Sequence, residues 1–166
     1  MAIIDYLLPE FDHEMATTRR VLERVPEHAF EWKPHEKSMS LGQLSAHLAN
    51  IPAWCSAVLD LPGADLAIDG ARYRSTFPQT RERLVNDFDG KLAGARASLA
   101  KQTDPELKAP WTLKNGGHEV FTLPRITALR SFILNHSIHH RGQLTVYLRL
   151  NNVALPPVYG PTADEQ

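Results

Sequence analysis

Residues 124–151 read PRITALRSFILNHSIHHRGQLTVYLRLN, and one row of positions in this segment repeats in steps of three and four. The row consists of Ile126, Leu129, Ile133, His136, His140, Gln143, Tyr147 and Leu150. Steps of this size place all of these side chains on one side of an α-helix. The segment therefore predicts a long helix that packs this side into the interior of a helical bundle.

Three earlier segments have the same helical spacing. The first covers 3–25 and ends before a proline. Ser40 and Gln43 have the spacing of a capping box, which begins a second helix that runs to about residue 61 and that we expect to kink at Pro52. Thr76 is predicted to cap a third helix, with Pro78 in its first turn. The buried face predicted for this third helix consists of Leu84, Phe88, Leu92, Ala95 and Leu99.

The remaining segments connect these helices. Residues 26–39 and 62–77 are predicted to be connections, the second of them a loop. Residues 104–122 alternate in polarity around an Asn-Gly-Gly turn, which predicts a β-hairpin. The proline-rich stretch 156–161 cannot be helical and should lie as an extended strap across one end of the bundle. The predicted fold class is all-α, a four-helix bundle with a small β-hairpin between helices 3 and 4, in a single domain over 1–166.

Composition excludes several classes of function. The chain has 166 residues, a formal net charge of −1 and a pI near 6.7, so it lacks the basic field that nucleic-acid binding needs. It has no apolar run long enough to span a membrane and no basic, apolar leader at its start. Cys55 is the single cysteine, which rules out an intrachain disulfide. We expect a cytoplasmic protein that binds neither nucleic acid nor membrane.

Polar residues on the buried side of the last helix indicate a metal site. His136, His140 and Gln143 occupy positions where an unpartnered polar group costs about 1–3 kcal/mol. Two histidines four residues apart lie one helical turn, or about 6 Å, from each other, so both imidazoles can reach one ion. The glutamate of the zinc-protease motif HExxH is missing, so that mechanism is not implied. The alternative is a pair of buried histidines whose side chains form hydrogen bonds with other residues of the core.

A third ligand is needed, and His47 is the best candidate because it lies at the inward edge of the second helix. Glu14 is either a further ligand, a general base or, more simply, an exposed residue at the bundle edge. His139 is rotated away from the row and is not expected to bind metal. The divalent ion held by His47, His136 and His140 is zinc, nickel, iron or manganese, since all of them accept imidazole.

Five short stretches resemble the DinB/YfiT-like family of metal-binding four-helix bundles. They are NHSIHHRGQL at 135–144, YLR at 147–149, PVYGP at 157–161, SMSLGQLSAH at 38–47 and IPAW at 51–54. The resemblance implies a three-histidine metal site at His47, His136 and His140, a homodimer and a helix connectivity other than plain up-and-down. Characterised relatives act with low-molecular-weight thiols as isomerases or S-transferases.

Together these observations predict a metal-dependent enzyme that acts on a small molecule as a thiol-dependent S-transferase or a hydrolase. The alternatives are a non-catalytic metal-binding bundle with a structural, sensing or storage role, and a metal-free interaction protein. A fourth protein ligand would favour the structural role. Asn50 and Gln143 are candidates to orient the ligands, because each lies one turn from one of them. Arg141 either receives an anionic substrate group or forms a structural salt bridge at the surface.

Two further sets of residues carry weaker predictions. The three tryptophans, Trp32, Trp54 and Trp111, either pack in the core or wall a substrate pocket. Phe132 and Val146 are apolar residues on the flank of the last helix, which favours a homodimer interface there. The alternative is that the hairpin of the same chain covers this flank.

Overall fold

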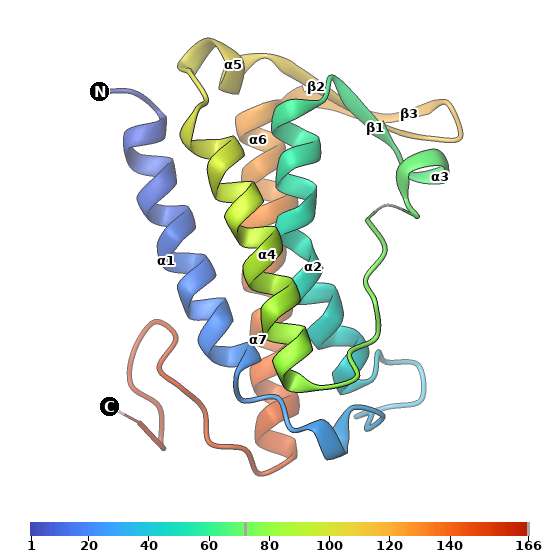
Figure 1. Cartoon of the computed structure of the whole chain (residues 1–166), viewed down its shortest axis with the longest axis vertical. Helices are drawn as coiled ribbons and strands as arrows, with labels where there is room; N and C mark the ends of the chain where they lie inside the picture. The colour runs from blue at the N-terminus through green and yellow to red at the C-terminus, as the bar shows by residue number, and fades with distance from the viewer. Residues whose placement is uncertain (72, 166) are drawn as a thin grey trace.

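The protein is described by a computed structural model that covers residues 1–71 and 73–165. Four long helical segments run side by side: α1 (Ile4–Leu22), α2 (Leu41–Asp60), α4 (Arg81–Ala100) and a last segment made of α6 (Arg125–Leu129), η2 (Arg130–Asn135) and α7 (His136–Leu150). Figure 1 shows these segments and the small sheet at one end of them. Most of the chain is helical, as predicted.

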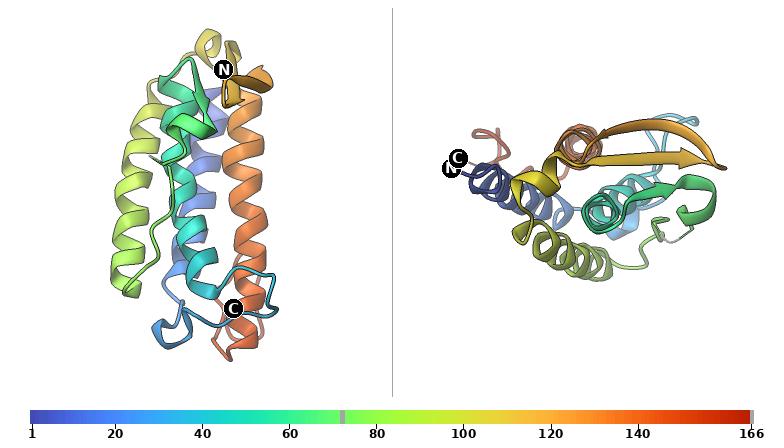
Figure 2. Two further views of the ribbon diagram at one scale, coloured as in Figure 1. Left: turned by 90° about the vertical axis from the view of Figure 1, so that its right-hand side faces the viewer. Right: turned by 90° about the horizontal axis from the view of Figure 1, so that it is seen from above.

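α1 and α2 follow each other in the chain but do not lie side by side in the bundle. α1 and α2 each pack against α4 and α7, as the end view in Figure 2 also shows. A plain up-and-down bundle would instead place α1 beside α2. Buried apolar side chains from all four segments fill the space between them, among them Phe11, Leu48, Phe88 and Leu144. None of the helices in the described part of the chain is long and apolar enough to cross a membrane.

Four short elements join the long ones, namely η1 (Glu27–Ala29), α3 (Leu66–Asp69), α5 (Asp104–Lys108) and the strand β1 (Gly63–Asp65). The predicted hairpin is present as β2 (Pro110–Asn115) and β3 (His118–Pro124), while 104–108 is helical. β1 pairs with β2 in parallel and makes the sheet three-stranded, so the prediction of 62–77 as a loop is wrong there. Residue 72 of that segment lies outside the described residues.

The turn of the hairpin is held by a residue distant in the chain. The Asp65 carboxylate accepts hydrogen bonds from the backbone N–H groups of Gly116 and Gly117, at 2.8 and 2.7 Å. Both glycines have positive φ angles of 61° and 82°, which side chains rarely allow. These bonds lower the pKa of Asp65, since they favour its charged form. Asp65 thus ties β1 to the hairpin.

The first turns of two helices test the capping predictions. Ser40 and Gln43 form the predicted capping box, with bonds of 3.2 and 2.8 Å between each side chain and the other's backbone N–H. The predicted cap at Thr76 is wrong, because Thr80 accepts the bond from the Arg83 backbone N–H at 3.1 Å and α4 begins after it. Phe77, which precedes α4, packs edge-on against Phe30 with ring centroids 6.1 Å apart.

The last helical segment contains a π-helical turn, η2, directly before α7. A π turn holds more residues than an α turn and therefore rotates the following helix about its axis. The predicted buried row is correct through Leu129 and Ile133. After η2 the buried residues are Ser137, Arg141, Leu144 and Leu148. The predicted row is wrong from this point: His136, His140 and Tyr147 are half-buried, while Gln143 and Leu150 are exposed.

Arg141 and Glu14 form a buried ion pair between α7 and α1. Arg141 is 1% exposed and Glu14 7% exposed, so neither is the surface residue that the sequence predicts. Arg141 Nη2 donates to Glu14 Oε2 at 2.6 Å and to the Tyr159 hydroxyl at 2.6 Å. The salt-bridge alternative for Arg141 is confirmed, in the interior. The C-terminal segment leaves the end of α7 and folds back on itself beside the end of α1, as Figure 1 shows, with the Thr162 hydroxyl bonded to the Leu155 carbonyl at 2.9 Å. It is thus a loop rather than the predicted extended strap, and it brings the Tyr159 hydroxyl to this pair.

Candidate metal centre

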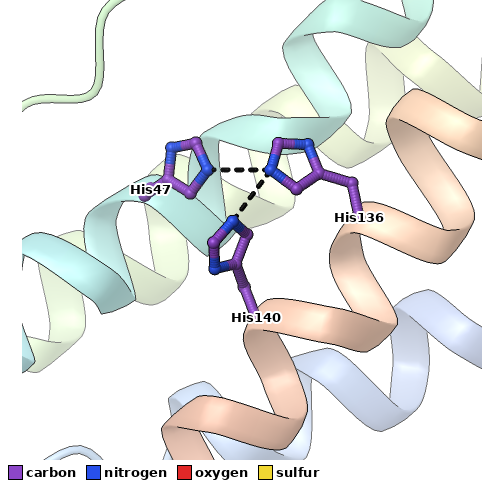
Figure 3. Close-up of side chains that lie close together, drawn as sticks. All are labelled: His47, His136 and His140. Carbon is purple, nitrogen blue, oxygen red and sulfur yellow. Dashed lines mark hydrogen bonds between the residues drawn. The ribbon is translucent and has the colours of Figure 1, made fainter.

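Three histidines converge between α2 and α7, as Figure 3 shows. His47 comes from α2, and His136 and His140 come from successive turns of α7. His136 Nε2 lies 3.2 Å from His47 Nε2 and 2.8 Å from His140 Nε2. The ligand atoms of all three lie within 4.8 Å of one another. The structure thus brings together the three residues that the sequence singled out.

The outer nitrogens of two rings have hydrogen-bond acceptors. His136 Nδ1 lies 3.2 Å from the backbone carbonyl oxygen of Phe132, in the π-helical turn, and His140 Nδ1 lies 2.7 Å from Gln143 Oε1. An imidazole that donates its Nδ1–H to an acceptor keeps a lone pair on Nε2. Both bonds therefore favour the tautomer whose Nε2 faces the centre of the cluster. The prediction that Gln143 orients a ligand is in agreement with this contact.

Asn50, the other predicted partner, has a different contact. Its side-chain amide donates to the backbone carbonyl of Tyr73 and so ties α2 to the segment that follows α3. Asn50 lines the same pocket as His47 but forms no hydrogen bond with a histidine among the described residues. The prediction that Asn50 lies near the histidines is correct, but its hydrogen-bond partner is the Tyr73 carbonyl, which is remote in the chain.

The environment keeps these imidazoles neutral. Burial, followed by the nearby rings of His140 and His136, lowers the pKa of His47 to about 4. Burial is also the main cause that lowers the pKa of His136 and of His140. Because a proton and a metal ion compete for the same lone pair, a lowered pKa leaves the nitrogens available near pH 7.

The residues fit a divalent ion on three grounds. Nitrogen ligands at about 2.0–2.1 Å from one ion in tetrahedral geometry lie roughly 3.3–3.4 Å from each other, close to the observed 3.2 and 2.8 Å. In addition, the lone pairs of neutral His136 and His140 face each other, which is unfavourable without a positive charge between them. Imidazole is also a ligand that divalent transition metals prefer.

The other candidate residues lie outside this group. Among the described residues, the cluster with ligand atoms in reach of one ion contains only the three histidines. Glu14 is not part of it and is bonded to Arg141 instead. His139 is exposed, and its ring packs beside that of His140 at 4.8 Å. Burial raises the pKa of Cys55 to about 12, so its thiol is neutral and is not a nucleophile.

A pocket of about 340 Å³ opens beside the histidines. His47 and His136 form part of its wall, and most of the remaining wall is apolar. Trp54 and Trp111 line it, in agreement with the alternative that tryptophans wall a pocket, and Trp111 is at the same time a core residue that is 1% exposed. Trp32 instead packs edge-on against Tyr147, with ring centroids 5.6 Å apart. The sequence analysis missed Tyr73, whose contribution depends on the fold of the segment after α3.

Comparison with known proteins places this chain in a family. The sequence model described as the DinB family matches residues 4–166. The uncharacterized protein YrdA of Bacillus subtilis (strain 168) is 20% identical over 168 residues, which cover 98% of this chain and 91% of YrdA.

Two crystal structures of DinB-like proteins have a similar fold. That from Bacillus cereus has a TM-score of 0.70 at 20% identity and covers 92% of this chain and 95% of its own. The DinB-like protein YjoA from Bacillus subtilis has a TM-score of 0.71 at 19% identity, with coverages of 93% and 97%.

Proposed function

The chain belongs to the DinB family, and on that premise we propose that it is a metal-dependent enzyme that transfers a low-molecular-weight thiol to a small electrophile. The observation that carries the proposal is the juxtaposition of two features. Three imidazole nitrogens converge on one point, and two of the three rings also line an apolar pocket of about 340 Å³. A ligand set with only three protein groups leaves coordination positions for substrate, as in catalytic sites.

Each residue of the site has a defined part in this proposal. His47, His136 and His140 hold the ion, and Gln143 fixes the orientation of His140 through its Nδ1. When bound, a divalent ion lowers the pKa of a coordinated thiol or water and so supplies a nucleophile at neutral pH. The thiol comes from outside the protein, because Cys55 is completely buried and protonated.

The lining of the pocket favours thiol transfer over hydrolysis. None of the described residues that line it is a carboxylate, so no general base of that kind is near the reacting group. A thiol that the bound ion would deprotonate needs no further base, and an apolar pocket suits an electrophilic carbon on an apolar molecular body. The histidine cluster also has no fourth ligand from the described residues, which argues against a purely structural metal site.

The test is an activity screen with matched controls. Untagged protein loaded with zinc, nickel, iron or manganese is mixed with glutathione, cysteine or coenzyme A and with 1-chloro-2,4-dinitrobenzene, whose chloride is displaced by the thiol sulfur. We expect a thioether to form in a metal-dependent reaction that His140→Ala abolishes and His139→Ala leaves intact. Thiol-independent cleavage of a nitrophenyl ester would instead indicate a hydrolase. Metal binding without either reaction would support the non-catalytic alternative.

A further inference from the structure

The pocket beside the histidines combines an apolar interior with one cationic group. Among the described residues that line it, Arg74 is the one arginine, and lysine, aspartate and glutamate are absent from the lining. The rest of the wall is aromatic, aliphatic or uncharged. This distribution of charge is not explained by metal binding, because a cation beside the ion would weaken its binding.

Flat aromatic side chains supply much of the interior surface. Trp54 and Tyr73 lie against each other with ring centroids 4.3 Å apart and planes inclined by 32°. Trp111 and Phe132 complete the aromatic part of the wall. Aromatic walls of this kind favour a planar apolar ligand, which contacts the ring faces and edges while it is removed from water.

Arg74 is placed where it can meet a charge on such a ligand. The side chain is exposed and forms no ion pair with any described residue, whereas six of the eleven described arginines have carboxylate partners. Tyr73, the residue before Arg74, is held by two contacts. Its carbonyl accepts a hydrogen bond from the Asn50 amide, and its ring packs against Trp54. Because Tyr73 is held in this way, Arg74 is kept among the residues that line the pocket, and none of the described lining residues is a carboxylate.

We propose that the pocket binds an amphipathic small molecule with a flat apolar body and one anionic group, the body lying among the aromatic residues and the anion at Arg74. That this molecule also accepts the thiol depends on the function proposed above. Binding of the molecule can be measured without any reaction, so the ligand class and the thiol transfer are tested independently of each other.

The experiment compares 2-naphthoate with 2-naphthamide, two ligands of the same shape of which the first alone is charged. Affinities are measured by tryptophan fluorescence and calorimetry on the full-length chain, both metal-loaded and after EDTA treatment. We expect both ligands to bind and the carboxylate to bind about fivefold more tightly, the upper range for an exposed charge pair. Arg74→Gln should remove this preference without changing the affinity for the amide, while Arg83→Gln, at another exposed arginine, should retain it.

Three outcomes would overturn the proposal. Equal affinity for carboxylate and amide in the unmodified chain would show that the pocket does not recognise charge. A preference that survives Arg74→Gln and disappears with EDTA would assign the recognition to the metal ion. Absence of binding by both ligands would remove the flat apolar body from the proposal. If the ligands bind as expected and no thiol transfer occurs with any acceptor of this class, the ligand class stands and the proposed reaction fails.

Discussion

Replacement of Arg141 by methionine should weaken both the fold and the metal site, although Arg141 is not one of the three histidines. The guanidinium bonds to the Glu14 carboxylate at 2.6 Å, the Glu14 carbonyl at 2.9 Å and the Thr18 hydroxyl at 3.3 Å. Methionine fills a similar volume but leaves the Glu14 carboxylate buried without its counter-charge. Removal of one partner of a buried ion pair costs about 3–5 kcal/mol.

That cost is a large part of the stability of a domain. A change of 1 kcal/mol shifts Tm by about 2–4 °C at this chain length, so Arg141→Met should lower Tm by about 6–20 °C. The double variant Glu14→Gln/Arg141→Met removes both charges and should recover part of this loss, since a neutral pair needs no counter-charge. Scanning calorimetry on the metal-free protein measures Tm for both variants and for the unmodified chain.

The matched control is Arg130→Met. Arg130 forms an ion pair with Glu10 at 2.8 Å that also joins the last helical segment to α1, but its side chain is 52% exposed. An exposed pair contributes about 0–1 kcal/mol, so this variant should shift Tm by only a few degrees. Equal shifts for Arg130→Met and Arg141→Met would refute the argument from burial.

Arg141 should also affect metal affinity through helix rotation. It follows His140 directly and fixes the side of α7 that faces the core after the π turn. We expect Arg141→Met to reduce metal affinity about tenfold, the lower range for residues that position ligands, whereas Arg130→Met leaves it unchanged. An unaltered affinity in Arg141→Met would show that the histidines keep their positions without the ion pair.

Three other predictions follow from the contacts of the site and the surface. Gln143→Leu should lower metal affinity about 10–100-fold in competition with a chromophoric chelator, because His140 loses its Nδ1 acceptor; an unchanged affinity would contradict that role. The metal-free chain should lose stability to urea as the pH falls from about 6.5, the usual pKa of histidine, toward 4. In this range His47 binds a proton in the unfolded state but not in the folded state. The loss should be smaller in His47→Leu, and an equal dependence of stability on pH in both chains would contradict the lowered pKa of His47. We expect a homodimer, so light scattering should give a mass of twice 18.6 kDa. Val146 lies on the predicted interface with its side chain 57% exposed, and Val146→Glu should give the monomer mass. A monomer mass for the unmodified chain would refute the dimer.

The local parts of the fold were predictable from sequence. Helical spacing located the four long segments, and the capping box at Ser40 located the start of α2 to the residue. The i, i+4 histidines converge because one helical turn separates them, and Gln143 reaches His140 because it lies three residues further along the same helix. These features depend on separations of a few residues, which regular geometry converts directly into distances.

The parts that the sequence analysis missed depend on contacts between distant segments or on irregular backbone. β1 has three residues, too few to show alternation, and forms only because β2 lies beside it. The π turn has no signal in the spacing of apolar residues, yet it rotates α7 so that Arg141 replaces His140 in the core. Glu14 then appears as a buried partner of Arg141 rather than an edge residue, which no pattern within α1 indicates.

Metal content of the purified chain tests the central claim most directly. Untagged protein, prepared without chelator and analysed by elemental mass spectrometry, should hold about one divalent ion per chain, as a single three-histidine site requires. His47→Ala, His136→Ala and His140→Ala should each retain less than about a tenth of it while circular dichroism shows an unchanged helical fold, and His139→Ala should retain it fully. A chain that binds no divalent metal under any loading condition, or equal metal loss in His47→Ala and His139→Ala, would contradict the three-histidine site.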